Sequence, residues 1–202
     1  MSLRIWLPLD GDLKNLGTSD AIVTNSSATI NTTGKIGSCY SFAKNAYLDI
    51  NKETMQNFSN AVSICFWIKI NSWNTNWDTI FQAGKGSTAW TQYHIGILRN
   101  SANYLCWTLG DGSTASNAQY QTGDIAVGQW THVTCTYGEG KWATYLNGIL
   151  SKSGTTTIVP NFSNITSIKI GGLAGNYKCD CLLNDFRIYD HCLSAAEVHE
   201  IS

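Results

Sequence analysis

The alternation of apolar and polar residues is clearest between Gly128 and Gly148, where it predicts three strands joined by two tight turns. Every second residue of the first strand falls on one face, namely Thr131, Val133, Cys135 and Tyr137. The residues between them fall on the other face. The segment Gly138-Glu139-Gly140 supplies positive φ angles for one turn, and Asn147-Gly148 favours a type I′ hairpin for the other. A meander of this kind has one apolar face, so more antiparallel sheet must cover it.

The same alternation predicts short strands along most of the remaining chain. They are expected over residues 3–9, 21–24, 34–42, 46–50, 61–70, 79–83, 92–99, 104–109, 155–158, 167–170 and 182–189. Residues 51–60 form a connector with room for one helical turn, and residues 71–78 and 111–122 are polar loops. About a dozen strands with so little helix predict a sandwich of two sheets in a single domain over residues 1–202.

One helix is expected, at the C-terminal end. Ser194 and Glu197 have the spacing of a capping box, with Ser194 as the N-cap. Leu193 and Val198 flank the box in the positions of a hydrophobic staple. These signals predict a helix of about two turns after the last strand.

Charge and composition exclude several classes of partner. The formal net charge is -1, charged residues make up only 13% of the chain, and no basic run occurs. Nucleic acids and anionic membranes require clustered Lys and Arg, so neither is expected as a partner. No stretch approaches the ~20 apolar residues of a membrane span, which argues against membrane insertion. The first twelve residues lack the features of a signal peptide, so we expect synthesis in the cytoplasm without a Sec signal.

The chain contains 7 Cys, and several of them lie inside predicted strands, where a free thiol acts as a small apolar group. An odd number in strand positions favours reduced cysteines in a protein made in a reducing compartment. The alternative is a single disulfide, for which Cys179 or Cys181 with Cys192 is the best pairing.

Several segments resemble laminin G-like, concanavalin A-like domains. The family's core pattern, W-x-H-V followed by T-Y-D-G and L-Y-V-N-G, and its final pattern, I-D-E-V-R-I-Y-N-R-A-L-S-x-E-E-I, each have a counterpart. The matching segments, in order along nearly the whole chain, are Leu9-Asp10-Gly11, residues 63–69, 129–133, 137–138, 145–148, 168–171, 183–189 and 193–198. The resemblance implies a concanavalin A-like jelly roll of two antiparallel sheets, one of them concave, whose members often bind glycans or proteins.

A second resemblance concerns the protein's setting. A short chain that opens with residues 3–9 and ends with this domain is similar to stand-alone jelly-roll proteins of phages and prophages. This resemblance implies a place on the virion surface, in the tail or as a decoration, with other virion proteins as further partners.

Glycoside hydrolysis needs two carboxyl groups, about 5–5.5 Å apart in retaining enzymes and about 6.5–9.5 Å apart in inverting enzymes. The four glutamates are Glu53 in a connector, Glu139 in a turn, and Glu197 and Glu200 on the terminal helix, so none lies on a predicted face of a sheet. His94, with Tyr93 and Arg99, corresponds only weakly to the residues of lyases with this fold. We therefore expect no enzyme activity and no catalytic residues.

The resemblance also implies one structural Ca²⁺ where the first strand meets the last. The family's usual ligand there is the Asp of I-D-E-V-R-I-Y, but this chain has Asn184, which supplies oxygen without charge. Asp10 and Asp12 in the opening turn are the other candidate ligands. The alternative for both is that their side chains only hydrogen-bond to the backbone of the turn.

Aromatic residues are abundant, with 8 Trp and 9 Tyr, and several of them fall in loops rich in Gly and Asn. The apolar face of a pyranose stacks on indole while short polar side chains bind its hydroxyls. We therefore predict a carbohydrate site formed by Trp73, Asn74, Asn76, Trp77, Asp78, Trp90, Asp111 and Tyr120. The alternative for each aromatic residue is packing on the edge of the sandwich.

The sequence thus predicts a non-catalytic binding module for a cell-surface glycan or host-surface receptor. Two other classes stay open: a structural decoration or oligomerisation domain without a ligand, and a degenerate glycoside hydrolase or lyase.

Overall fold

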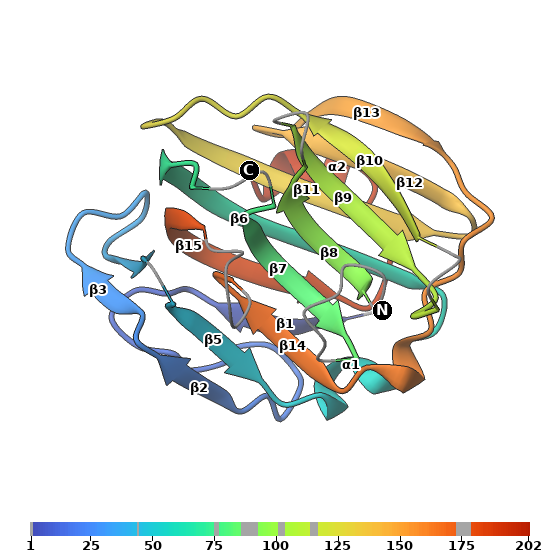
Figure 1. Cartoon of the computed structure of the whole chain (residues 1–202), viewed down its shortest axis with the longest axis horizontal. Helices are drawn as coiled ribbons and strands as arrows, with labels where there is room; N and C mark the ends of the chain where they lie inside the picture. The colour runs from blue at the N-terminus through green and yellow to red at the C-terminus, as the bar shows by residue number, and fades with distance from the viewer. Residues whose placement is uncertain are drawn as a thin grey trace.

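The computed structural model describes residues 2–43, 45–74, 77–85, 93–100, 104–113, 117–172 and 179–202. Two antiparallel β-sheets pack face to face, and sheet B lies nearer the viewer than sheet A in Figure 1. The predicted all-β, concanavalin A-like jelly-roll sandwich with one short C-terminal helix is confirmed.

Within the described residues, sheet A has eight strands in the order β13-β12-β11-β6-β15-β4-β3, with β1 paired to β15 off this path. Its strands are β1 (Leu3–Leu7), β3 (Thr29–Asn31), β4 (Cys39–Phe42), β6 (Ala61–Ser72), β11 (Trp130–Gly138), β12 (Lys141–Leu146), β13 (Ile149–Thr155) and β15 (Asp180–Tyr189). The last strand, β15, pairs with β1, β4 and β6, so it joins the two ends of the chain.

Sheet B has seven strands in the described part of the chain, in the order β10-β9-β8-β7-β14-β5-β2. Its strands are β2 (Val23–Ser26), β5 (Tyr47–Ile50), β7 (Thr79–Gly84), β8 (Tyr93–Arg99), β9 (Leu105–Gly110), β10 (Asn117–Gly123) and β14 (Ser167–Ile170). Four consecutive strands from β7 to β10 form an antiparallel meander in the front layer of Figure 1.

The core fills the space between the sheets. Phe186 of β15 stacks on Phe66 of β6 with ring centroids 5.4 Å apart, and it meets Phe81 of β7 in the other sheet at 5.6 Å. All three rings are fully buried. Burying an aromatic ring stabilises the fold by roughly 25 cal/mol per Å² of apolar surface, so this cluster holds the two layers together.

The meander predicted between Gly128 and Gly148 is present as β11, β12 and the start of β13. Glu139 and Gly140 have φ values of 51° and 71°, and Asn147 and Gly148 have 50° and 77°. Positive φ at both central residues is the signature of the type I′ turn, whose twist matches that of the strands.

Helices α1 and α2 follow the predicted signals, whereas the sequence did not predict the 3₁₀ turn. Helix α1 (Glu53–Gln56) is the expected single turn, a 3₁₀ turn spans Phe162–Asn164, and α2 (Ala195–Glu200) ends the chain. The capping box is formed, since Ser194 Oγ accepts from the Glu197 backbone N–H and the Glu197 carboxylate accepts from the Ser194 N–H. Leu193 and Val198 are both buried in a satellite cluster, which confirms the staple. In the described part of the chain, no helix is both long and apolar enough to cross a membrane.

Several boundaries differ from the predictions. Residues 111–122 were expected to be a loop, but β10 begins at Asn117 and pairs with β9 along its length. Its Gln and Asn residues have low β-propensity, and cross-strand pairing overrides that preference. The strand expected over 155–158 lies earlier, as β13, and the one expected over 34–42 is limited to β4.

All seven cysteines lie in the described residues, and all are free thiols. Six are buried and Cys192 is exposed. Cys181 and Cys192 lie at opposite ends of β15, roughly 30 Å apart at 3.3 Å per residue. A disulfide needs Cα atoms within about 7 Å, so the alternative pairing to Cys192 is wrong.

Candidate functional site

Five of the residues predicted to bind a ligand lie between β6 and β7 in the sequence, and the structure describes four of them. Trp73 packs against the main core, and the Arg99 guanidinium lies 5.0 Å from the centre of its ring. Asp78 is fully buried, and its Oδ2 accepts a hydrogen bond of 2.6 Å from the Asn74 backbone N–H. Trp77 is half-buried. The Asp78 carboxylate therefore fixes the backbone at Asn74.

The remaining predicted residues are spread more widely. Tyr120 stacks on Trp142 of sheet A, with ring centroids 4.3 Å apart, and closes the side of the sandwich between β10 and β12. Asp111 follows β9 and lines a cavity of about 420 Å³ with Phe58 and Asn161. Two predicted residues, Asn76 and Trp90, lie outside the described residues.

The Trp73 loop and Asp111 sit at opposite ends of sheet B. The register pairs Leu98 with Thr79, just after the Trp73 loop, whereas Asp111 follows the other end of the same meander. The strands between them are about 20 Å long. The predicted residues therefore do not form one cluster, and the outer face of sheet B separates them.

A continuous row of polar positions crosses that outer face. The register places Lys169 opposite both Asp49 and Gln82, Gly96 opposite both Gln82 and Thr108, and Thr108 opposite Gln119. We call Asp49, Lys169, Gln82, Gly96, Thr108 and Gln119 the polar row. Lys169 Nζ lies 2.7 Å from Asp49 Oδ2, which closes one end of the row with an ion pair.

The middle of the row contains buried polar groups without partners. Gln82, Thr108 and His94, which lies two residues before Gly96 on the same face of β8, are at most 1% exposed. Among the described residues, none of the side-chain nitrogens and oxygens of these three residues has a hydrogen-bond partner. We call Gln82, His94 and Thr108 the polar cluster.

Elsewhere in the described residues, a buried side chain has at most one polar atom without a hydrogen-bond partner, as in His132 and Thr134 of sheet A. In Gln82 and His94 every polar side-chain atom is unpaired. Gly96 has no side chain, so no Cβ atom stands between Gln82 and Thr108, whose strands are two spacings, roughly 10 Å, apart.

Leaving a buried polar group unpaired costs about 1–3 kcal/mol, and native folds rarely accept it without another role. Three such groups around one glycine form an arrangement that hydroxyl groups of a ligand, or ordered water, can complete.

His94 enters this cluster as a neutral ring. Burial and, to a lesser extent, the charge of Lys85 lower the pKa of His94 to about 4. A neutral imidazole has one donor and one acceptor nitrogen. The ring is held from one side by Gly112, where φ is +80° and a Cβ atom would overlap the imidazole.

Sequence reasoning missed Gln82 and Thr108, although one signal was present. Both are polar residues at the outward position of strands that are otherwise apolar, Ile80 to Ala83 and Leu105 to Leu109. A polar residue in a strand buried on both faces requires a partner, and that requirement identifies it as a candidate.

The three predicted metal ligands lie near the end of β1, and two of them meet at Ser38. Asn184 Nδ2 donates to the Ser38 carbonyl at 3.0 Å, and Asp10 Oδ1 accepts from the Ser38 N–H and Oγ, both at 2.7 Å. Asp12 Oδ1 accepts from the Lys14 N–H at 3.1 Å. The described residues contain no group of three or more His, Cys, Asp or Glu side chains that could hold a metal ion.

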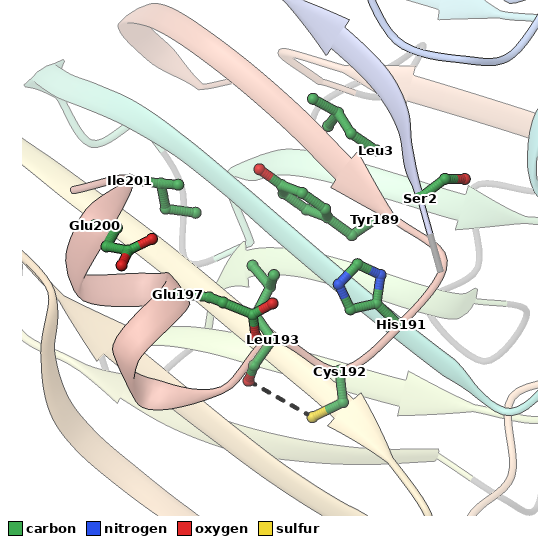
Figure 2. A pocket seen from close by; sticks show the side chains of 9 residues that line it. All are labelled: Ser2, Leu3, Tyr189, His191, Cys192, Leu193, Glu197, Glu200 and Ile201. Carbon is green, nitrogen blue, oxygen red and sulfur yellow. Dashed lines mark hydrogen bonds between the residues drawn. The ribbon is translucent and has the colours of Figure 1, made fainter.

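A second cavity, of about 470 Å³, lies on the other side of the molecule between β1, the end of β15 and α2 (Figure 2). Glu197 points into it, but its carboxylate accepts hydrogen bonds of 2.7 Å from both the N–H and the Oγ of Ser194. Those hydrogen bonds lower the pKa of the Glu197 carboxyl, which serves as part of the capping box of α2. This cavity is therefore part of the packing of α2, and the polar cluster is the stronger candidate.

Carboxylates are few in the described strands of sheet B. Across the described strands of sheet B, Asp49 is the one acidic residue, and it is paired with Lys169. The four glutamates lie on α1, in the β11–β12 turn and on α2. The described strands of sheet B therefore carry no pair of carboxyl groups of the kind that glycoside hydrolysis requires.

The fold is shared with solved binding domains. Domain 4 of AbnA, a GH43 extracellular arabinanase from Geobacillus stearothermophilus in complex with arabinotriose, matches with a TM-score of 0.77 and 21% identity over 98% of this chain and 97% of that domain. The binding domain of botulinum neurotoxin DC, in complex with rat synaptotagmin II, matches with a TM-score of 0.73 and 19% identity. The match covers 100% of this chain and 50% of that one. The binding domain of Paraclostridial Mosquitocidal Protein 1 matches with a TM-score of 0.76 and 18% identity, and the match covers 99% of this chain and 51% of that one.

The chain spans about half the length of the two toxin binding domains. At these identities the likeness shows the fold. No curated protein matches the sequence. Residues 42–199 match the family described as the concanavalin A-like lectin/glucanases superfamily.

Proposed function

Because the chain belongs to the concanavalin A-like lectin/glucanases superfamily, we propose that it is a non-catalytic binding module that recognises a carbohydrate on the outer face of sheet B. The observation that carries the proposal is the polar cluster of Gln82, His94 and Thr108, whose buried polar atoms have no partner among the described residues.

The chemistry of the cluster suits a sugar. A hydroxyl group both donates and accepts, and so do the Gln82 amide, the Thr108 hydroxyl and a neutral imidazole. The cluster itself carries no net charge at neutral pH, because the pKa of His94 is about 4. It therefore favours an uncharged stretch of glycan over an acidic one.

The residues predicted from the sequence frame this face. Trp73, Trp77 and Asp78 lie at one end of the meander and Asp111 at the other, about 20 Å apart along the strands. A glycan lying on the polar cluster would extend toward one of these ends, where Trp77 offers an aromatic surface. Asn76 and Trp90 belong to the same proposal through the sequence.

The solved neighbours support this class of ligand. Domain 4 of the arabinanase is in complex with arabinotriose, and the neurotoxin domain is in complex with a synaptotagmin. We take a cell-surface glycan or a host-surface receptor as the partner class. The scarcity of carboxylates on sheet B supports a module that binds without hydrolysis.

The more specific form of the proposal places the domain on a phage virion, in the tail or as a decoration. It rests on the resemblance of the sequence to jelly-roll proteins of phages and prophages. Mass spectrometry of purified particles from the producing strain tests it: recovery of the chain with capsid and tail proteins supports this setting, and its absence from intact particles contradicts it.

A glycan array followed by calorimetric titration of the best hit tests the binding proposal, with arabinan-derived oligosaccharides included. We expect wild-type binding and at least a tenfold weaker affinity for Gln82→Leu and for Thr108→Val. The matched control is Thr134→Val, which removes a hydroxyl that is equally buried and unpaired but lies on sheet A. It should bind like wild type.

If no glycan binds, or if Thr108→Val and Thr134→Val bind equally well, the outer face of sheet B is not the site. The unpaired atoms then serve ordered water, and a purely structural role becomes the better account. Turnover of the bound glycan would instead restore the hydrolase or lyase class.

A further inference from the structure

The end of β1, the loop over residues 34–38 and the middle of β15 meet at one buried side chain, Asn184. It is 1% exposed. Asn184 Nδ2 donates to the carbonyl oxygens of Pro8, at 2.8 Å, and of Ser38, at 3.0 Å. Asn184 Oδ1 accepts from the Ile36 N–H at 2.8 Å. One amide thus ties together three segments that are far apart in sequence.

The three partners fix the orientation of the amide. The two carbonyls can only accept and the Ile36 N–H can only donate, so Nδ2 must face Pro8 and Ser38 and Oδ1 must face Ile36. A carboxylate could not take this place unaided, because it would set negative oxygens against two carbonyl oxygens.

Most of the oxygens that converge at this junction already accept hydrogen bonds from the chain. The Pro8 carbonyl also accepts from the Asp185 N–H at 2.9 Å, so both of its lone pairs are used. Asp10 Oδ1 accepts two hydrogen bonds from Ser38, which lower the pKa of that carboxyl. Asp185 forms a bidentate pair with Arg187, at 3.0 and 2.8 Å, and accepts from Trp6 Nε1 at 2.7 Å.

The junction also holds two residues in the left-handed region. Leu9 has a φ of 58° and Asp185 a φ of 52°, and each lies next to a group that bonds at this point, Pro8 and Asn184. A left-handed residue other than glycine costs roughly 1–3 kcal/mol and persists only when its surroundings fix it. The hydrogen bonds to Pro8 from Asn184 and Asp185 provide that restraint.

A calcium ion would require six to eight oxygen ligands at this point. The converging carbonyls face N–H donors instead, the Asp10 carboxylate accepts hydrogen bonds from Ser38, and the Asp185 carboxylate is paired with Arg187. We propose that the Asn184 amide takes the place of a cation here, so that the junction between β1, loop 34–38 and β15 is stable without metal. The residues present do not fit the structural Ca²⁺ that the resemblance implies.

Thermal unfolding with and without calcium tests the proposal. The wild-type melting temperature should change by less than about 1 °C between EDTA and 5 mM CaCl₂. Asn184→Asp should melt roughly 5–10 °C lower in EDTA, since the carbonyls lose their donors and face a charge. Calcium should then recover at least about half of that loss, because the new carboxylate and the two carbonyls can bind it.

Asn184→Ala is the control, because it removes the donors without adding a carboxylate. It should be destabilised and should not respond to calcium. Terbium luminescence gives a second readout through Trp6, which contacts Asp185. Asn184→Asp should sensitise terbium emission and wild type should not, and this can be recorded in calcium-refolded protein if the variant does not fold in EDTA.

Three results would overturn the proposal: a wild-type melting temperature that rises by several degrees with calcium, an Asn184→Asp variant as stable as wild type in EDTA, or one that neither calcium nor terbium affects. The first would show that the junction binds metal as it stands. The second and third would show that the amide does not occupy a cation's position.

Discussion

The Asn184 junction and the polar cluster of sheet B are both buried and polar, and they differ in one respect. At the junction, one amide makes three hydrogen bonds, and the neighbouring carboxylates are paired with Ser38 and Arg187. In the polar cluster, no polar side-chain atom has a partner among the described residues. A closed network stabilises the fold, whereas an open one keeps its hydrogen-bonding capacity for something outside the chain.

The largest effect is expected from Asn184→Leu, which keeps the branched shape and removes all three hydrogen bonds. We expect a loss of about 2–3 kcal/mol in the free energy of unfolding, because the Ser38 and Pro8 carbonyls lose a buried donor. That corresponds to a fall of about 4–10 °C in melting temperature, measured by calorimetry. A change of less than about 1 °C would show that the closed network contributes little.

The next effect concerns pH and the two buried histidines. Burial lowers the pKa of His94 and of His132 to about 4, below the value near 6.5 of the unfolded chain. The stability that each neutral ring contributes is complete above pH 6.5 and is lost as the pH falls toward 4. By pH 5 the loss is about 2 kcal/mol for each histidine.

Urea unfolding of wild type and His94→Gln at pH 7.5 and pH 5 measures this effect. The variant should lose about 2 kcal/mol less than wild type between the two values, because only His132 still titrates from a depressed pKa. An identical pH dependence in the two proteins would mean that His94 is accessible to protons in the folded state, and that the cluster is more open than described.

The smallest effect is on the free energy of unfolding when either of two threonines on neighbouring strands of sheet B, Thr108 of β9 or Thr122 of β10, is replaced by valine. The two substitutions should act in opposite directions. Thr108→Val removes an unpaired buried hydroxyl and should leave the free energy of unfolding unchanged or raise it by up to about 1 kcal/mol. Thr122→Val is the matched control, since Thr122 is equally buried but its Oγ donates to the Leu105 carbonyl at 3.1 Å. It should lower the free energy by about 1 kcal/mol.

Chemical denaturation at a single temperature is sufficient to compare the two variants. Equal losses in both would indicate that Thr108 has a partner in the folded protein, and the contrast with the junction would then disappear.

Much of the fold could be predicted from local signals. Asn147-Gly148 specified its turn, Ser194 and Glu197 specified the helix start, and alternation placed β6 and β11 in the core. The strand β10 could not be predicted, because its residues have weak preferences and only the pairing with β9 makes them extended.

The site could be predicted only in part. Composition led to the Trp73 loop, and the family resemblance led to Asn184. The polar cluster depends on the register that sets Gln82 and Thr108 on either side of Gly96, across three strands. Whether a buried side chain finds a partner depends on the assembled neighbourhood, which no local pattern encodes.

The most direct test of the central claim is an NMR titration that follows the side-chain amide groups of Gln82 and Asn184 in one spectrum, with the best glycan from the array as ligand. The account predicts that the Gln82 amide resonances shift as the ligand saturates, because the amide gains hydrogen-bond partners. The Asn184 amide should be protected from the start and unchanged throughout. Binding that leaves Gln82 unmoved, or that shifts Asn184 as much as Gln82, would contradict the assignment of the open cluster as the site.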